Sequence, residues 1–411
     1  MTALRVKTLL GMLLVTGVLF ASASVVCAQT KGRTGTRRQA PAKPKLSPQA
    51  NAEHQEAAKR GDEARLAGRL NEAVEHYISA LKIRPDWVEG WWHVGTILYD
   101  GDHYEAARDA FRNLTALDSK KGPAWALLGL CEFQTREYER AVVSMQRGRS
   151  LGLAGNVELE NVVRYHAALV YIRFEQFEIA FEILREFLQS GNESSKVIEA
   201  FGLTMLRMPF LPNEIPPDKR EQVLIAGRAG FNMAARRKDE ARGAFDELLA
   251  RYPDAPNVHY GFGVYLLNHD ADAALKEFNR ELEISPSHVP AMLQLAFEYL
   301  KRAEHEAALP WAEKAVQFAP KMYPGRNVLG RVLIELGQVE RAIKELEEGV
   351  RLAPDSPEMH YALARAYTRA GRRQDAARER EIFQRLEKLY NAKRPGAPAE
   401  DGTDNPPKAK P

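Results

Sequence analysis

Side chains capable of catalysis occur throughout the chain, but they do not form a common catalytic motif. The sequence contains neither the His-Glu-x-x-His helix of zinc proteases nor a phosphate loop ending in Gly-Lys-Ser/Thr. The sequence Gly261-Phe262-Gly263 lies inside a helical pattern and not at a strand-to-helix turn. The 10 histidines lack paired ligand spacing, so we expect His259, for example, to lie in a seam or groove. We therefore predict no enzyme activity, no cofactor and no metal site.

The elements that must position any functional side chain follow a helical pattern with a period of about 34 residues. The pattern runs from near His54 to near Tyr390, and each period reads as helix, turn, helix and stop. A small residue opens the second helix of each unit, where two helix backbones come close: Ala73, Ala107, Ala141, Ala180, Ala241, Ala274, Ala308, Ala342 and Ala376. A larger side chain usually follows one turn later on the same face: Tyr77, Phe111, Met145, Leu184, Phe245, Phe278 and Leu346. Prolines end several units, because proline cannot continue a helix: Pro85, Pro253, Pro286, Pro320 and Pro354.

This pattern resembles the tetratricopeptide repeat family, whose signature combines Trp, Leu-Gly and Tyr in the first helix with Ala, Phe or Tyr, Ala and Pro in the second. Two adjacent units show it most clearly, at Trp91, Val94-Gly95, Leu98, Ala107 and Phe111, and at Trp125, Leu128-Gly129, Tyr138 and Ala141. The resemblance implies an all-α fold. We expect a right-handed superhelical solenoid of about nine helix-turn-helix units plus one irregular helix.

Departures from the period divide the chain into segments. We predict a signal peptide over 1–28, a disordered basic linker over 29–50, an N-terminal array over 51–208, a Pro-rich interruption over 209–219, a C-terminal array over 220–390 and a disordered tail over 391–411. In the interruption, four prolines between Pro209 and Pro217 replace the expected second helix. The interruption is either a tolerated insertion between stacked units or a loop whose apolar residues, such as Leu211 and Ile215, cap or occupy a groove.

The N-terminus has the layout of a secretory signal, with basic residues, an apolar run over 9–20 and small residues before Gln29. We expect cleavage before Gln29 and a periplasmic or secreted protein. The alternatives are an uncleaved membrane anchor and lipid attachment at Cys27. After cleavage Cys131 would be the only thiol, so an intramolecular disulfide could not form. We expect Cys131 to be a small buried hydrophobe.

The segment that follows the signal is basic and contains no acidic residue between 29 and 48. Solvation of a disordered leader explains this composition. The alternative is weak contact with an anionic membrane or cell-wall polymer. Because the formal net charge of the whole chain is only +3, the charge does not favour binding to nucleic acid.

The family resemblance implies that the first helices line a concave face and carry the ligand contacts. The corresponding peptide-binding positions are Trp92, Thr96, Tyr99, Phe133, Tyr165, Ile172, Tyr260, Phe297, Arg331 and Arg365. The aromatic members are expected to anchor a ligand, because aromatic residues dominate interface hot spots. The alternative is that these side chains mostly pack against neighbouring repeats. The two arginines could bind a carboxylate or phosphate, or belong to a solvated face paired with Glu335 and Glu358.

We therefore predict a non-enzymatic scaffold of the cell envelope that binds a polypeptide partner in the concave apolar groove of the solenoid. One subtype of the family holds a partner's C-terminal carboxylate with Lys and Asn, but the corresponding positions here include Ala58 and Ala126, so that clamp is absent. Two alternatives stay open. The chain could serve as an assembly, polysaccharide-export or secretion scaffold, or its groove could carry an apolar small molecule.

Overall fold

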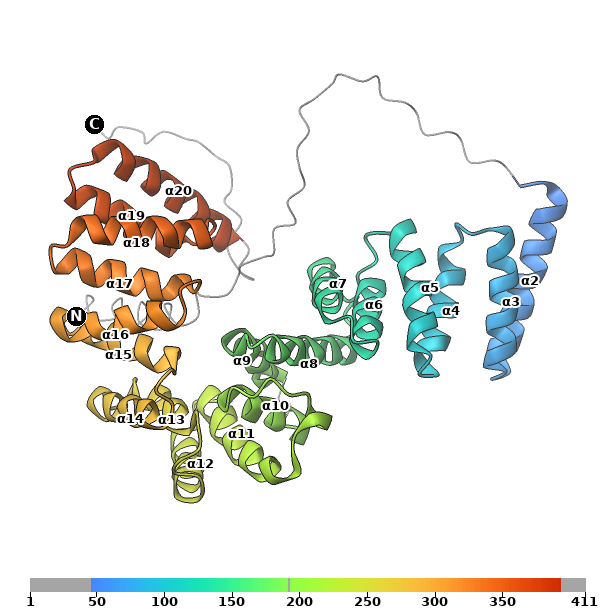
Figure 1. Ribbon diagram of the computed structural model, residues 1–411. Coiled ribbons are helices and arrows are strands. Elements are labelled where there is room, and N and C mark those ends of the chain that lie inside the picture. The colour runs from blue at the N-terminus through green and yellow to red at the C-terminus, as the bar shows by residue number, and fades with distance from the viewer. Residues whose placement is uncertain (1–45, 191–192, 393–411) are drawn as a thin grey trace, which may run out of the picture. The chain divides into compact units, whose positions relative to one another are not determined.

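The repeat predicts helices throughout, and the computed structural model of the protein has them (Figure 1). It describes residues 46–190 and 193–392, and within these ranges the chain forms 19 α-helices and no strand. Successive helices pair as antiparallel neighbours, apart from one additional helix, α10 (Ser195–Met205). The predicted all-α repeat solenoid is confirmed.

The first compact unit extends to Arg251. Its paired helices are α2 (Pro48–Leu66) with α3 (Leu70–Ile83), α4 (Val88–Asp100) with α5 (Tyr104–Leu117), α6 (Gly122–Gln134) with α7 (Tyr138–Leu151), α8 (Val157–Arg173) with α9 (Phe177–Arg185), and α11 (Arg220–Ala234) with α12 (Lys238–Arg251). Three short 3₁₀ segments, η1 (Glu186–Ser190), η2 (Pro212–Glu214) and η3 (Pro217–Lys219), lie beside α10 in the chain.

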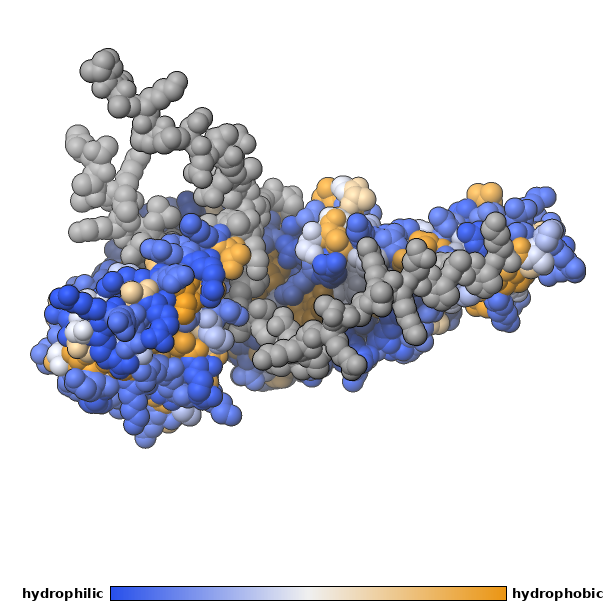
Figure 2. Space-filling model, turned by 90° about the horizontal axis from the view of Figure 1, so that it is seen from above, coloured by the Kyte–Doolittle hydropathy of each residue, from blue (hydrophilic) through white to orange (hydrophobic). Residues whose placement is uncertain are grey.

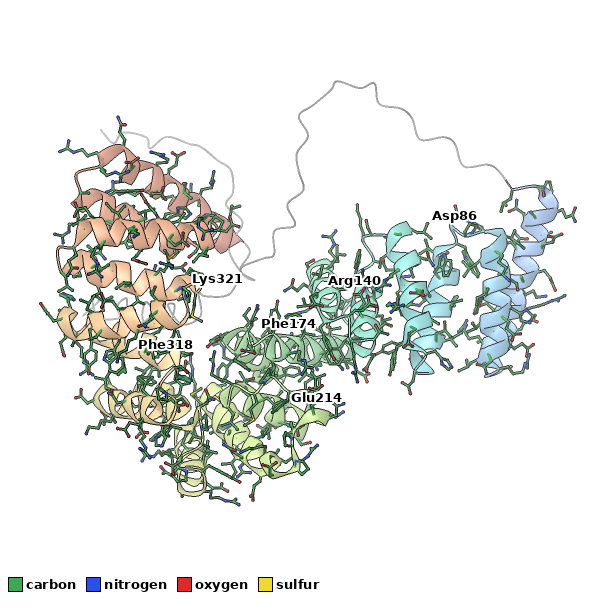
Figure 3. The ribbon with its side chains drawn as sticks, viewed as in Figure 1. Asp86, Arg140, Phe174, Glu214, Phe318 and Lys321 are labelled. Atoms are coloured by element: carbon green, nitrogen blue, oxygen red, sulfur yellow. The ribbon has the colours of Figure 1, made fainter. Side chains whose placement is uncertain are left out.

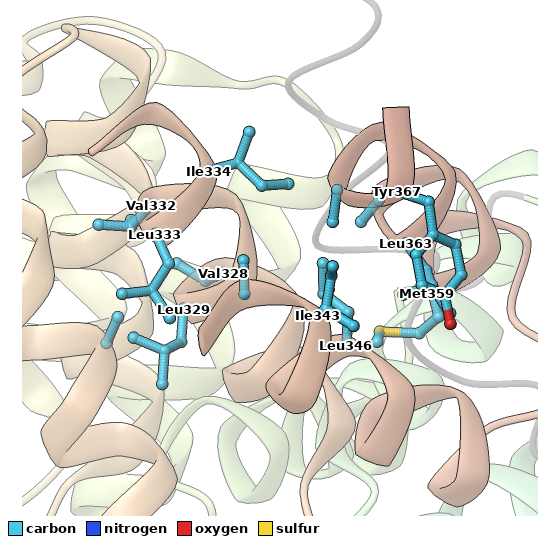
Figure 4. Packing of buried hydrophobic residues seen from close by; sticks show 14 of the residues in the cluster. Val328, Leu329, Val332, Leu333, Ile334, Ile343, Leu346, Met359, Leu363 and Tyr367 are labelled. Atoms are coloured by element: carbon cyan, nitrogen blue, oxygen red, sulfur yellow. The ribbon is translucent and has the colours of Figure 1, made fainter. Parts of the chain in front are cut away.

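The second compact unit begins at Tyr252. It contains α13 (Val258–Leu266) with α14 (Ala271–Ile284), α15 (Val289–Lys301) with α16 (His305–Phe318), α17 (Tyr323–Glu335) with α18 (Val339–Leu352), and α19 (Pro357–Arg369) with α20 (Arg373–Ala392). Figure 4 shows part of its core, in which residues such as Leu333, Leu346 and Leu363 meet between α17, α18 and α19. On the face seen in Figure 2, hydrophobic residues form small areas among hydrophilic ones, as expected when each helix buries its apolar side.

The small and large columns of the repeat form the packing core. All nine alanines that open the second helices expose at most 1% of their surface, and the seven larger residues one turn later expose none. The large side chain packs against a glycine of the first helix in several units. A Cβ atom on Gly330 would lie 2.4 Å from Leu346 Cγ, and one on Gly95 would lie 2.7 Å from Phe111 Cε1. The first helix therefore needs glycine at this position to let its partner helix approach.

A second recurring device joins five of the first helices to the preceding turn. Side-chain N–H groups at one column of the first helices donate to the backbone carbonyl six residues earlier: Trp91 to Pro85, Trp125 to Ser119, His259 to Pro253, Arg326 to Pro320 and His360 to Pro354. The donor–acceptor distances are 2.8, 3.0, 2.8, 3.1 and 2.8 Å in that order. The carbonyl at the end of one unit thus gains a hydrogen-bond partner from the next unit.

The irregular helix α10 has a close partner, although its expected second helix is replaced by the interruption. A Cβ on Gly202 would lie 1.9 Å from the carbonyl oxygen of Val223, and one on Gly227 would lie 2.1 Å from that of Ile198. These two glycines let the backbones of α10 and α11 cross closely. Helix α11 therefore packs against both α10 and α12.

Some boundaries differ from the predicted segments. Helix α2 begins at Pro48, inside the expected linker 29–50, because Ser47 Oγ accepts the N–H of Ala50 (3.1 Å) and caps the helix. Helix α20 reaches Ala392, just inside the expected tail. The chain passes from the first compact unit to the second between Arg251 and Tyr252, whereas the Pro-rich interruption lies within the first unit. The predicted signal peptide, most of the linker and nearly all of the tail lie outside the described residues.

Candidate functional site

A concavity of about 620 Å³ opens in the first unit. It is lined by α6, α8, α10 and residues 209–219, which we call the strap. Its lining includes Phe133, Tyr165, His166, Lys196, Glu199 and Leu211–Glu214. Two of the predicted aromatic anchors, Phe133 and Tyr165, thus lie together with the Pro-rich interruption. The volume is within the range of about 300–1,000 Å³ typical of ligand sites.

An aromatic cluster forms one side of the concavity. The His166 ring lies edge to face with Phe133, with 4.8 Å between centroids, and with Tyr165, with 5.4 Å between centroids. His166 Nδ1 is 2.8 Å from the carbonyl oxygen of Val162. Burial lowers the pKa of His166, which favours the neutral ring. In the tautomer that donates to Val162, Nε2 is a hydrogen-bond acceptor.

Polar groups stand beside these rings. Burial, with a smaller contribution from Glu199, raises the pKa of Tyr165 to about 12, so its hydroxyl stays protonated at neutral pH. Burial also raises the pKa of the Glu199 carboxyl, while Arg220, 3.6 Å away, opposes that shift. The concavity therefore combines apolar ring surface with a hydroxyl donor and a carboxylate acceptor.

The strap forms a fixed wall of the concavity. Arg173 at the end of α8 donates to the carbonyl oxygen of Pro209 (3.1 Å) and forms an ion pair with Glu214 (2.8 Å). Glu214 also accepts the backbone N–H of Leu211 (3.0 Å). Leu211 and Ile215 are buried, whereas Glu214, labelled in Figure 3, lies at the exposed edge. The apolar strap residues thus cap part of a concave surface, which was one of the two interpretations of the interruption.

The other predicted positions of the first unit lie outside this concavity. Trp92 packs edge to face against Phe111, and Lys121 Nζ lies 4.3 Å from its ring centroid. The Thr96 hydroxyl donates to the Trp92 carbonyl (2.9 Å) within α4. Tyr99 is half-buried against Tyr104, and burial raises the pKa of Tyr99 to about 12. Trp92 and Tyr99 therefore pack against core residues of α5 and α6, whereas Thr96 bonds within its own helix.

Two residues near the concavity are packed too tightly to present much surface. Ile172 exposes none of its surface, because α10 packs against α8 and the strap is bonded to the neighbouring Arg173. The prediction that Ile172 lies on the surface of a groove is therefore wrong. Phe133 exposes 9% of its surface and still lines the concavity. Cys131 is buried as expected, and burial raises the pKa of its thiol to about 12.

In the second unit the predicted positions fall into two groups. Tyr260 is buried at the start of α13, where its ring lies 4.8 Å from that of His288 and its N–H donates to Glu281 Oε2 (3.2 Å). Phe297 is half-buried beneath Arg331, whose guanidinium carbon lies 5.6 Å from the ring centroid. Tyr260 therefore serves packing, whereas Phe297 belongs to a cationic surface.

The two predicted arginines differ in their partners. Arg365 pairs with Glu335 at 2.6 Å. Glu358 accepts the Ser356 hydroxyl (2.8 Å). In the described part of the chain, no acidic side chain lies within ion-pair distance of Arg331. The predicted pairing with Glu335 thus forms for Arg365 but not for Arg331.

Sequence reasoning missed the polar members of the concavity. His166 follows the predicted anchor Tyr165 directly, and Glu199 lies on α10, the predicted irregular helix. Placing both residues on the helices of the repeat could have suggested them. Lys196 carried no signal, because one exposed lysine is ordinary.

The described ranges hold neither a metal-ligand cluster nor a membrane-spanning helix. Residues 46–190 and 193–392 contain no group of three or more His, Cys, Asp or Glu side chains that could hold a metal ion. No helix among these residues combines the length and the apolar character needed to cross a membrane.

Comparisons with known proteins identify the repeat. Two family models, each described as tetratricopeptide repeat, match residues 95–147 and 233–289, and residues 299–366 and 333–379. The human Protein O-mannosyl-transferase TMTC3 is 25% identical over 248 residues, which are 57% of this chain and 27% of that protein. The General transcriptional corepressor trfA of Dictyostelium discoideum is 23% identical over 139 residues, which are 34% of this chain and 10% of that protein. The chain thus spans only a minor part of either relative.

Solved structures of MamA proteins are also similar to part of the chain. The MamA RS-1 ArsTM double mutant has a TM-score of 0.39 and 23% identity, covering 42% of this chain and 97% of that one. The MamA 41-end structure from Desulfovibrio magneticus RS-1 has a TM-score of 0.38 and 23% identity, covering 43% of this chain and 98% of that one.

Proposed function

This chain is a tetratricopeptide repeat protein, and from that premise we propose that it is a non-enzymatic scaffold that holds a segment of a polypeptide partner. The observation that carries the proposal is the concavity of the first unit, where Phe133, Tyr165 and His166 meet the strap. Aromatic faces suit apolar side chains of a peptide. The Tyr165 hydroxyl and His166 Nε2 can bond to its backbone amides.

Peptide binding suits the chemistry of this concavity better than catalysis does. Its one half-buried carboxylate, Glu199, already has the cation Arg220 nearby, and the ring of His166 is held by a backbone carbonyl. A mannosyl-transferase is named among the relatives, but only 27% of that protein is matched. We therefore do not carry its activity over to this chain.

We further propose that the protein acts in the cell envelope, after export directed by residues 1–28. The support is the order of basic, apolar and small residues before Gln29. N-terminal sequencing of the protein isolated from its own cells should begin at Gln29. An intact Met1 on protein recovered from the cytoplasm would remove the proposal of export while leaving the scaffold role untouched.

Photo-crosslinking tests the peptide site. With p-benzoylphenylalanine in place of Tyr165, we expect a crosslinked polypeptide after irradiation of cells that produce the full chain. The same residue in place of Val143, which is exposed on α7, is the matched control. Tyr165→Ala should weaken partner binding by a factor of about 30, as loss of an anchor worth about 2 kcal/mol would.

Two outcomes would contradict the proposal. Equal polypeptide crosslinking from positions 165 and 143 would show that the concavity is not selective. A small apolar molecule crosslinked to position 165, in the absence of a polypeptide, would favour the carrier alternative. Identification of a secretion or polysaccharide-export protein as the crosslinked partner would define which envelope process the scaffold serves.

A further inference from the structure

A column of cationic and aromatic side chains in the second unit is separate from the concavity described above. Phe297 on α15, Arg331 on α17 and Arg365 on α19 occupy equivalent positions of successive first helices. Tyr361 lies one helical turn before Arg365 and exposes 52% of its surface. The repeat therefore brings two guanidinium groups and two rings to one surface of this unit.

Arg331 is the unusual member of the column. Its guanidinium stacks over Phe297 at 5.6 Å and is half-buried. Neither an ion pair nor a hydrogen bond is formed by its side chain with any described residue. Burial, and secondly the nearby Arg365, lowers the pKa of Arg331, although an arginine remains charged at neutral pH. The protein thus holds a partly desolvated cation that forms no direct ion pair, because Glu335, the acidic side chain that acts on it, is bonded to Arg365. Such a cation is costly unless a ligand neutralises it.

The charge balance of the column points to one anionic group. Arg331 and Arg365 contribute two positive charges, and Glu335, 2.6 Å from Arg365, contributes one negative charge. The remaining single positive charge matches one carboxylate. A phosphate dianion would exceed that charge and would lie near the Glu335 carboxylate. Arginine also presents its N–H donors in a planar fork that fits the two oxygens of a carboxylate.

We propose that Arg331 and Arg365 form a second binding site, which takes a carboxylate side chain from an acidic segment of a peptide partner. Arg331 supplies the unpaired fork. Arg365, whose side chain is 36% exposed, donates from the other side while Glu335 holds its orientation. Tyr361, which is exposed, provides ring surface for the peptide, whereas the Phe297 ring supports the Arg331 guanidinium. This site does not depend on the concavity of the first unit.

The test uses the full chain and two capped peptides with a rhodamine label, one of alternating Asp and Ser and one of alternating Asn and Ser. Fluorescence anisotropy should show binding of the Asp peptide, with little binding of the Asn peptide. Arg331→Gln should weaken the Asp peptide about tenfold, as loss of a charged hydrogen bond would. Arg365→Gln should weaken it as well. Arg351→Gln, at an exposed arginine of α18, is the matched control and should leave the affinity unchanged.

Stability measurements separate a ligand site from a structural role. Because Arg331 is partly desolvated and unpaired, Arg331→Met should leave the thermal midpoint unchanged or raise it. A lowered midpoint in Arg331→Met would mark Arg331 as a packing residue and overturn the proposal. Equal affinity of the Asp peptide for wild type and Arg331→Gln would also overturn it, as would calorimetric binding of inorganic phosphate to a chain that does not bind the Asp peptide. Tyr165→Ala should retain full affinity for the Asp peptide, so failure here is distinguishable from failure of the proposed function.

Discussion

Two histidines of the second unit each contact an acidic side chain and a backbone carbonyl. His259 Nδ1 lies 2.6 Å from Glu277, and its Nε2 lies 2.8 Å from the Pro253 carbonyl oxygen. His360 repeats this geometry with Glu379 and the Pro354 carbonyl, at 2.6 and 2.8 Å. Both ring nitrogens face acceptors, so the protonated ring can donate to both. The equivalent Trp91 of the first unit donates a proton that does not titrate at ordinary pH.

We predict that the second unit loses stability as pH rises because of His259. Burial opposes the charge of this ring, but hydrogen bonds to Glu277 and to the Pro253 carbonyl outweigh burial and raise the pKa of His259. A raised folded-state pKa means that the stabilisation is fully present below about pH 6.5, the value for an unfolded histidine. The stabilisation is lost as pH rises through the folded-state pKa. This loss can be measured by urea unfolding of the full chain between pH 5 and 9, with hydrogen exchange in α13 and α14 as the readout.

The control for this prediction is His269, an exposed histidine in the turn after α13. His259→Gln should flatten the pH dependence in α13 and α14, whereas His269→Gln should preserve it. Retention of the full pH dependence in His259→Gln would assign the effect to another group.

The sequence repeat predicted which residues form the core, but it did not predict which side chains of the groove are exposed. The period identifies Ala107 and Phe111 as packing positions because every unit must bury the same two sites. The same period also placed Ile172 on a groove, since a repeat pattern cannot tell what covers a given unit. The prediction that Arg331 binds a peptide came from its column and stays a prediction. Its lack of a direct ion pair could be seen only once Glu335 was found bonded to Arg365.

At the scale of helices, close approach within a pair depends on glycine facing a large side chain. Helices α17 and α18 meet where Gly330 faces Leu346, and a Cβ on Gly330 would lie 2.4 Å from Leu346 Cγ. Not every helical glycine has this role. Gly243 on α12 has no heavy atom within 4 Å of the place where its Cβ would stand.

The two glycines should respond oppositely to the same substitution. Gly330→Ala gains helix propensity of about 1 kcal/mol but overpacks the helix pair at a cost of about 1–3 kcal/mol, so we expect net destabilisation. Gly243→Ala should gain about 1 kcal/mol of stability, because nothing opposes the better helix former. Urea unfolding followed by hydrogen exchange in α17–α18 and in α11–α12 measures each effect. Destabilisation by both substitutions would contradict the packing argument, as would stabilisation by both.

Helix pairs could be predicted because they share the period, whereas α10 shows the limit of that reasoning. The prolines after Met208 correctly indicated the loss of a second helix. The sequence did not reveal that α11 would replace it, because Gly202 and Gly227 are too far apart in the chain to suggest a crossing. Such a partner is specified by tertiary packing and not by local pattern.

At the scale of the whole chain, each of the two compact units has its own candidate site. The first has an aromatic concavity with a pinned wall, and the second has a cationic column. A repeat array is stabilised mainly by contacts between neighbours. Substitutions at Tyr165 and at Arg331 should therefore affect binding at their own sites independently. Tyr165→Ala is accordingly expected to leave binding of the Asp peptide unchanged. The fold class followed from the period, while the division between Arg251 and Tyr252 carries no comparable signal in the sequence.

The strap has a consequence for how a bound chain would be positioned. A strictly periodic surface offers an extended ligand several equivalent registers, since sliding by one repeat restores much the same environment. The strap interrupts the described repeats at one position of the first unit, where Arg173 holds it through Pro209 and Glu214. The strap makes one position of the array different from the others. An extended ligand that contacts the strap can therefore bind in one register only.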